Sequence, residues 1–244
     1  MKNYKITIQY DGTRYNGWQR QGNTKNTIQE KFENVLEIMC KKKTEIFSSG
    51  RTDAGVHALC QVANFKCEVN MTCKEIMDYL NEYLPEDIRV TSAEEADERF
   101  HSRLNAVSKT YEYSIATVKP DVFIRKYVYA VAEKPDVKKM ISAAEKLKGT
   151  HDFRGFSSLG KTKKSTVRTI NSIDITENDG IIKITVNGNG FLYNMMRIIS
   201  GTLYEIGIGK LPENTIQTVF ESGIREKSGV TFPSKGLKLV CVNY

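Results

Sequence analysis

The first hundred residues alternate between the two-residue period of a strand and the longer period of a helix. Residues 4–10 place apolar side chains at every second position, which predicts a half-buried strand. Residues 28–39 place them on one helical face, after a Thr27–Glu30 pair typical of a capping box. The chain therefore begins with a strand followed by an amphipathic helix.

The same kind of pattern continues to residue 91. Two short runs at 44–48 and 61–66 predict strands, and a second capping box opens a helix over 72–84. Residues 88–91 predict a further strand. The resulting β-α-β-β-α-β order is the split arrangement of ferredoxin-like sheets.

Charged residues 94–103 have weak periodicity and mark the expected boundary between an N-terminal half, 1–104, and a C-terminal half, 105–244. The second half also mixes both periods, with strands near 109–117, 167–176 and 181–187 and helices near 136–148 and 191–206. The sequence contains no exact repeat, and no long linker separates the two halves. The pattern predicts an α+β protein built from two closely packed halves.

Charge adds an expectation about the partner. The chain of 244 residues carries a formal net charge of +7 and has a sequence pI near 9.0. Excess Lys and Arg favour a polyanion such as nucleic acid, although many soluble proteins are mildly basic. No uncharged apolar run approaches the ~18 residues of a membrane span, and the N-terminus lacks the apolar region of a signal peptide. We therefore expect a cytoplasmic protein with no membrane contact.

Cysteine and histidine spacing argues against a metal site. The five cysteines are odd in number and include no C-x-x-C pair, which predicts reduced thiols rather than a disulfide framework or a zinc site. The three histidines lie far apart and lack partners at helical spacing. We expect them to form structural hydrogen bonds.

The segment 50–57, G-R-T-D-A-G-V-H, holds a carboxylate and an arginine between two glycines after a β-like run. Gly50 and Gly55 allow backbone angles or close approaches that a Cβ would resist, so Asp53 can lie at the tip of a defined loop. The alternative is an Asp that only stabilises a turn through hydrogen bonds to the backbone. The candidates elsewhere in the chain favour a reactive Asp53.

The loop 11–20, D-G-T-R-Y-N-G-W-Q-R, interleaves basic and aromatic side chains. Arg14, Arg20 and the only tryptophan, Trp18, suit a stacked ligand that carries phosphates. Trp18 could equally anchor the loop to the core. Both interpretations are compatible with the sequence.

Further candidates lie in the second half. Tyr111 and Tyr113 point to one face of the expected strand, either as core or as a surface on which a base stacks. Arg197 lies off the apolar face of its helix and pairs with a surface carboxylate or with a buried catalytic one, whose ionised form it favours. The basic segment 161–164 is either a solvated surface or a set of phosphate contacts.

Six motifs together are similar to those of a known family. They are Y-D-G-T-x-Y-x-G-W-Q-R-Q at 10–21, G-R-T-D-A-G-V-H at 50–57, R-F-H-S-R at 99–103, K-T-Y-E-Y at 109–113, S-T-V-R-T-I at 165–170 and N-G-F-L-Y-N-M-M-R at 189–197. The chain resembles the tRNA pseudouridine synthase A family from the first strand to the last. The G-R-T-D motif is highly specific, and no catalytic position departs from the family pattern.

The resemblance implies an isomerase that converts uridine to pseudouridine at positions 38, 39 and 40 in the anticodon stem-loop of tRNA, without cofactor or metal. It implies two RRM-like halves, each with a mixed, mainly antiparallel sheet, that meet at a central basic cleft. It also implies a homodimer in which one tRNA touches both subunits. The reaction breaks the glycosidic C–N bond, turns the uracil and rejoins it through C5, so the site must hold a detached base.

The resemblance also implies residue roles. Asp53 matches the essential carboxylate, Tyr111 the aromatic residue that packs on the target base, and Arg197 the basic residue that pairs with the carboxylate. Arg51 matches an arginine associated with extruding the uridine, which costs a few kcal/mol of stacking. The expected contacts to the RNA backbone are Arg14, Arg20, Lys161, Lys163 and Lys164.

Residue types leave the chemistry of the steps open. Asp53 either attacks C1′ of the ribose to form an ester or removes a proton at C2′ to give a glycal. Either Tyr111 or Asp53 takes the proton from C5. Both routes need a carboxylate in the same place.

Two alternative functions belong to other classes of protein. A non-catalytic RNA-binding module would explain the charge and the aromatics without any need of Asp53. A phosphate-binding enzyme in which Asp53 holds Mg²⁺ is disfavoured, since no G-x-x-x-x-G-K-[ST] is present and no second carboxylate accompanies Asp53 in its loop.

Overall fold

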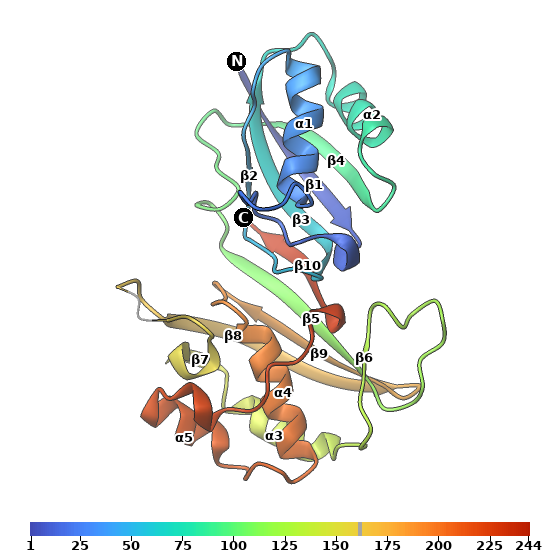
Figure 1. The fold of residues 1–244 in the computed structure, drawn as a ribbon. Coiled ribbons are helices and arrows are strands. Elements are labelled where there is room, and N and C mark those ends of the chain that lie inside the picture. Colours follow the sequence, from blue (N-terminus) through green and yellow to red (C-terminus); the bar gives the residue numbers. More distant parts are fainter. Residues whose placement is uncertain (161–162) are drawn as a thin grey trace. The chain divides into compact units, whose positions relative to one another are not determined.

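The computed structural model describes residues 1–160 and 163–244. The chain forms two compact units (Figure 1): unit 1 contains Met1–Val107 and Lys238–Tyr244, and unit 2 contains Ser108–Leu237. The expected division at 104/105 placed the C-terminal segment with the second half. In the structure this segment returns to unit 1, so unit 1 is built from both ends of the chain.

The sheet of unit 1 has the strand order β4-β1-β3-β2. Its antiparallel strands are β1 (Lys2–Tyr10), β2 (Ile46–Ser48), β3 (His57–Cys67) and β4 (Ile88–Ala96). Strand β10 (Leu237–Asn243) pairs in parallel with the start of β3, where Lys238 lies opposite His57. The predicted β-α-β-β-α-β order of the first hundred residues is confirmed.

Two helices, α1 (Ile28–Cys40) and α2 (Cys73–Tyr83), pack against this sheet and against each other. Thr72 and Glu75 form both bonds of a capping box at the start of α2. At α1 only one is present, because Thr27 accepts from the Glu30 N–H while the Glu30 carboxylate pairs with Arg20 instead. The alternating residues of β1 supply the core beneath the helices, with Tyr4, Ile6, Ile8 and Tyr10 all buried.

The cysteines correct one prediction from the sequence. Cys40 at the end of α1 and Cys67 at the end of β3 form a disulfide, with a Cα–Cα separation of 6.1 Å, while Cys60, Cys73 and Cys241 are free thiols. The expectation of five reduced cysteines is therefore wrong for two of them. The two partners lie 27 residues apart and meet only because the helix packs on the sheet, which spacing alone does not reveal.

The sheet of unit 2 has the order β5-β9-β8-β7, and all three of these pairings are antiparallel. Its strands are β5 (Ser108–Ala116), β6 (Tyr129–Ala130), β7 (Gly149–Asp152), β8 (Val167–Asn178) and β9 (Ile181–Gly188), with β6 parallel to β5. Asp179 and Gly180 both have positive φ and close the β8–β9 hairpin.

Unit 2 contains the helices α3 (Val137–Glu145), α4 (Met195–Gly207) and α5 (Thr215–Ser222). Short 3-10 turns complete the chain at Gly12–Arg14, Phe153–Phe156, Arg225–Lys227 and Ser234–Gly236. Helix α4 begins later than the predicted residue 191, because Asn194 has a left-handed φ of 61°. The predicted α+β class is confirmed, with helices packed on a mainly antiparallel sheet in each unit. No helix of the described residues is long and apolar enough to span a bilayer.

Candidate active site

Asp53 lies in the loop between β2 and β3, and buried polar side chains fix the base of this loop. The Ser49 N–H donates to the Val62 carbonyl at 2.7 Å. The Gln61 carboxamide accepts from the Ser49 hydroxyl at 2.7 Å and donates to the Gly50 carbonyl at 2.9 Å. Because Ser49 and Gln61 are fully buried, water does not compete for these bonds.

Tyr10 at the end of β1 and the following loop 11–18 support the Asp53 loop on both sides of Asp53. On the N-terminal side the Trp18 N–H donates to the Thr52 carbonyl at 3.0 Å, and the hydroxyls of Tyr10 and Thr52 lie 2.8 Å apart. On the other side the Gly55 N–H donates to the Tyr15 carbonyl at 3.2 Å. Burial raises the pKa of Tyr10 to about 12, so its hydroxyl remains protonated and able to donate at alkaline pH as well as at neutral pH.

The close contact of these loops requires glycine at position 17. Gly17 has a φ of 88°, and a Cβ there would lie 2.6 Å from the Thr52 carbonyl oxygen. The predicted special role of the motif glycines holds for Gly55, whose φ is 76°, whereas Gly50 does not have a positive φ.

Asp53 itself is half-buried, and its carbonyl accepts from the Val56 N–H at 3.1 Å, which closes a turn at the tip of the loop. Arg51, two residues earlier, is exposed and forms no ion pair within residues 1–160 and 163–244. The loop therefore presents a carboxylate and a guanidinium from a backbone that is fixed at both ends.

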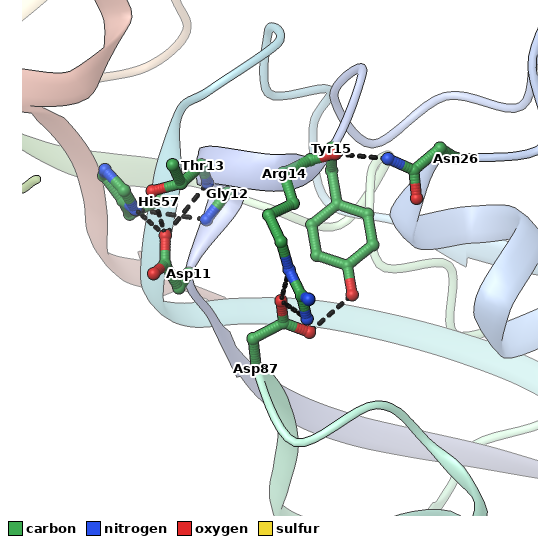
Figure 2. Close-up of polar contacts among 8 residues, drawn as sticks. All are labelled: Asp11, Gly12, Thr13, Arg14, Tyr15, Asn26, His57 and Asp87. Atoms are coloured by element: carbon green, nitrogen blue, oxygen red, sulfur yellow. Dashed lines mark hydrogen bonds and ion pairs between the residues drawn. The ribbon is translucent and has the colours of Figure 1, made fainter.

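A second polar cluster lies at His57, where the Asp53 loop leads into β3 (Figure 2). The Nδ1 of the buried His57 is 3.1 Å from the Gly12 N–H nitrogen and 3.1 Å from Asp11 Oδ1. Nδ1 accepts from the Gly12 N–H when it carries no proton and donates to Asp11 when it is protonated. Asp11 Oδ1 also accepts from the Thr13 N–H at 2.9 Å. His57 has the structural hydrogen-bonding role predicted for the histidines.

Arg14, an expected RNA-backbone contact, is bound to a carboxylate of the protein. Asp87 accepts from Arg14 Nε at 2.9 Å and Nη2 at 2.6 Å, and its other oxygen accepts from the Tyr15 hydroxyl at 2.5 Å (Figure 2). Burial first, and then Asp87, raises the pKa of Tyr15 above its usual range. Asp87 was not singled out from the sequence, because an Asp in a turn after Pro85 carries no signal of a partner 73 residues away.

Arg20 is likewise paired, with Glu30 at 2.8 Å and Glu33 at 2.9 Å, although its side chain is 56% exposed. Trp18, which lies between Arg14 and Arg20 in the sequence, is only 1% exposed and stacks on Phe32 with ring centroids 6.1 Å apart. Of the two interpretations of Trp18, the structure selects the core anchor.

The two tyrosines of β5 lie in the core of unit 2. Tyr113 is fully buried, and its hydroxyl donates to the Pro233 carbonyl at 2.7 Å. Tyr111 is 8% exposed and meets the Phe191 ring edge-on, with centroids 4.9 Å apart. Phe191 thus fixes the plane of the Tyr111 ring.

Arg197 is half-buried on the first turn of α4, and two hydrogen bonds fix its guanidinium. Nε donates to the Phe232 carbonyl at 2.6 Å, and Nη1 donates to Asn194 Oδ1 at 2.6 Å. The amide of Asn194 donates in turn to Ser158 Oγ at 3.1 Å. Asn194 was not singled out from the sequence, and its left-handed φ is the structural sign of its role.

The expected site residues therefore divide between the units. Asp53, Arg51, Arg14 and Arg20 belong to unit 1, and Tyr111 and Arg197 to unit 2. Lys163 and Lys164, also of unit 2, are exposed, and Lys161 lies outside the described residues. In the described part of the chain, no group of three or more His, Cys, Asp and Glu side chains is arranged to hold a metal ion.

Comparison with known proteins identifies the family. The family model for tRNA pseudouridine synthase matches residues 6–105 and 143–244. A protein of Bacillus sp. (strain KSM-64) named tRNA pseudouridine synthase A is 50% identical over 94% of each chain. Proteins named tRNA pseudouridine synthase A 2 from Bacillus anthracis and Clostridium perfringens are 46% and 45% identical over the full length of both chains.

Among solved structures, a crystal structure of a Cbf5-Nop10-Gar1 complex aligns with 97% of this chain and 48% of that chain, with 12% identity and a TM-score of 0.42. The sequence matches span nearly the whole chain at 45–50% identity. On this ground the chain belongs to the tRNA pseudouridine synthase family.

Proposed function

We propose that the protein isomerises uridine to pseudouridine in the anticodon stem-loop of tRNA, at positions 38, 39 and 40, with Asp53 as the catalytic carboxylate. The observation that carries the proposal is the Asp53 loop, in which the G-R-T-D-A-G-V-H motif places a half-buried carboxylate on a backbone fixed from both sides. A surface Asp that only caps a turn would not need the hydrogen bonds by which Gln61 and the loop 11–18 fix this backbone.

The reaction needs no external electron or group. The C1′–N1 bond breaks and a C1′–C5 bond forms, the C5 proton leaves, and N1 takes up a proton. Product and substrate are isomers, so neither a redox cofactor nor a group donor is required. We therefore propose catalysis by side chains alone, without cofactor or metal.

Asp53 acts in its ionised form on either route. An ordinary Asp, with a pKa of ≈ 3.9, is ionised at neutral pH. Attack at C1′ requires a nucleophile, and proton removal at C2′ requires a base, so a carboxylate serves both. Arg197 would keep that carboxylate ionised when the bound base displaces water.

The fixed geometry of Arg197 supports its role as the partner of Asp53. Two of the five N–H groups of its guanidinium bind Phe232 and Asn194, which sets the plane of the fork. The other N–H groups suit a carboxylate, for which the planar fork is well matched. Tyr111, held edge-on by Phe191, would pack on the target base.

The exposed Arg51 would take up the stacking and phosphate contacts that the flipped uridine vacates. Arg14, Arg20, Lys161, Lys163 and Lys164 would contact the RNA backbone and position the tRNA without reading its sequence. For Arg14 and Arg20 this means that RNA phosphates share guanidinium groups already paired with Asp87, Glu30 and Glu33. A homodimer, implied by the resemblance, and a cytoplasmic location, expected from the sequence, complete the proposal.

The proposal is tested by release of tritium from [5-³H]uridine in anticodon stem-loops that carry a single uridine at position 38, 39 or 40. The assay contains EDTA, so that a Mg²⁺-dependent enzyme would be inactive. We expect release by the wild type from each stem-loop and none by Asp53→Asn. Release that continues in Asp53→Asn, or that requires Mg²⁺, would overturn the proposal.

The matched control is Asp78→Asn, which removes an exposed carboxylate of α2 whose partner is Lys74. It should retain wild-type turnover. An RNA-binding module without activity would give no release from any variant but unchanged tRNA binding. Light scattering at a chain mass of 27.7 kDa tests the homodimer separately.

A further inference from the structure

The face of the unit 1 sheet opposite helix α1 carries a set of residues that the proposed reaction does not use. Cys67 is bonded to Cys40 of α1, so the alternate residues 63, 65 and 67 of β3 face that helix. Asn64 and Lys66 therefore lie on the other face. Their direct cross-strand partners share it, and these are Phe47 opposite Asn64 and Asn3 opposite Lys66.

The segment 97–105 is fixed onto this face by buried amides. Asn3, 2% exposed, donates to the carbonyls of Asp97 at 2.8 Å and Phe100 at 2.9 Å. Asn64, 3% exposed, accepts from the Ser102 N–H at 2.9 Å. The hydroxyl of Ser102 donates to the Phe47 carbonyl. The R-F-H-S-R motif is thus held rigidly beside β2.

An open pocket of about 1080 Å³ lies where this segment meets β2 and β3. We call it the Phe47 pocket. It is lined by basic and aromatic side chains, among them Lys42, Lys43, Lys66, Arg99, Phe47 and His101. Glu45 and Glu98 also line it, which leaves an excess of positive charge. The pocket is too wide and open for a small apolar ligand, whose sites enclose most of its surface.

The cations of the Phe47 pocket are available to a ligand. Lys43, Lys66 and Arg99 form no ion pair with any residue of the ranges 1–160 and 163–244, in contrast to Arg14 and Arg20. Within the described part of the chain, the one hydrogen-bond partner of the Lys42 ammonium group is the Met1 sulfur, at 3.3 Å. Three unpaired cations around one pocket favour an anionic ligand, because they repel one another in its absence.

An exposed aromatic pair lies beside these cations. The Phe47 side chain is 42% exposed, and its ring centroid is 5.2 Å from that of His101. His101 Nδ1 accepts from the Arg103 N–H at 3.1 Å, so in the neutral ring the proton resides on Nε2 as a donor. An exposed ring supported by a second ring offers a surface on which an unstacked base can lie.

We propose that the Phe47 pocket is a second RNA-binding site, in which Lys43, Lys66 and Arg99 hold backbone phosphates and one unpaired base stacks on Phe47. The inference rests on the proposed function, since the RNA is the tRNA substrate. His57 directly follows the Asp53 loop, and Asn64 lies opposite Phe47. Strand β3 runs about 23 Å from His57 to Asn64 at ~3.3 Å per residue. The site therefore binds nucleotides well away from the target uridine and acts on affinity rather than on the chemical step.

The test measures the salt dependence of full-length tRNA binding and the steady-state constants for tritium release. In Lys43→Ala/Lys66→Ala, we expect the magnitude of the slope of log K against log salt to fall by about 1 to 2. Each lost phosphate contact removes ~0.7–0.9 from this slope, and the double variant removes two cations. KM should rise several-fold at 0.15 M salt while kcat stays within twofold. Phe47→Ala should weaken binding about fivefold or more through lost stacking, with an unchanged slope.

Lys138→Ala/Lys139→Ala is the matched control, because it removes the same charge from two exposed positions on α3. It should leave slope and KM at wild-type values. Phe47→Tyr, which keeps a ring, should restore binding and shows that the Phe47→Ala loss is not misfolding. A wild-type slope in Lys43→Ala/Lys66→Ala, or an equal loss in the α3 control, would overturn the inference.

Failure of the proposed function would look different. It would appear as tritium release that persists in Asp53→Asn, or as no release from the wild type. Binding slopes do not depend on turnover, so they test the Phe47 pocket in either case.

Discussion

Gly12 lies directly against the carbonyl of Val56, so closely that a Cβ at residue 12 would stand 2.0 Å from the Val56 oxygen. The contact joins the Y-D-G-T segment to the last turn of the Asp53 loop. The two motifs are therefore parts of one structure, in which the first loop sets the position of the second.

We expect Gly12→Ala to displace the Asp53 loop, because backbone atoms rather than a flexible side chain oppose the new methyl group. Overpacking of this kind costs about 1–3 kcal/mol of stability, and turnover should fall at least tenfold. Thermal unfolding and tritium release measure the two effects. Gly22→Ala is the control, since a Cβ there meets nothing within 4 Å. Wild-type turnover in Gly12→Ala would show that the contact does not position Asp53.

Asn194 should matter for activity through Arg197. Asn194→Gly tolerates the φ of 61° and removes only the side chain, so we expect near-normal stability with kcat reduced about tenfold or more. Asn194→Ala should lose the same activity. Its free energy of unfolding should also fall by ~1 kcal/mol, because alanine is strained in the left-handed region. Chemical denaturation and kcat measurements separate the two effects. If Asn194→Gly turned over like the wild type, the hydrogen bond to Arg197 would have no role in catalysis.

Buried Tyr10 predicts a loss of stability at alkaline pH. Its pKa is raised from 10 to about 12, chiefly by burial, so its contribution is complete below pH 10 and is lost as the pH rises from 10 towards 12. Between pH 9 and 11 the loss in the free energy of unfolding amounts to about 1 kcal/mol. Urea unfolding at pH 9, 10 and 11 should show a smaller decrease for Tyr10→Phe than for the wild type. Parallel pH profiles for the two proteins would contradict the assignment.

The disulfide predicts a thiol count. Denatured, unreduced protein should react at Cys60, Cys73 and Cys241 only, and all five cysteines should react after reduction. Closing a loop of this length stabilises a protein by about 3–4 kcal/mol in the chain-entropy model, so reduction should lower Tm. Cys73→Ser is the control and should not change the response to reductant. Five reactive thiols before reduction would exclude the bond.

The elements of unit 1 were predictable because its helices and strands each bury one face. The alternation of Tyr4, Ile6 and Ile8 identifies β1 before any partner is known. The strands β6 and β7 are too short for a period to appear, and β10 was not predicted either. For β10 the pairing that defines it joins Lys238 to His57, a relationship that no local pattern contains.

The constrained loop around Asp53 was predictable because its glycines mark backbone positions that a Cβ would resist, whereas contacts between two distant side chains were not. The G-R-T-D motif indicated a constrained loop around Asp53, and the structure supplies the constraint from Tyr10, Trp18 and Gln61. The carboxylates that pair with Arg14 and Arg20 could not be assigned, since a charged residue on a surface looks the same in sequence whether or not it has a partner.

The return of β10 to unit 1 has a consequence for folding during synthesis. A ribosome synthesises residues 108–237 before it makes Lys238–Tyr244, so unit 1 lacks one of its strands until all of unit 2 has been synthesised. Until then the start of β3 has no parallel neighbour, and the Val107 N–H lacks its bond to the Asn243 carbonyl. The loop that presents Asp53 leads directly into this incomplete edge. A nascent chain would therefore hold Asp53, the proposed catalytic carboxylate, in a settled position only after β10 has been translated.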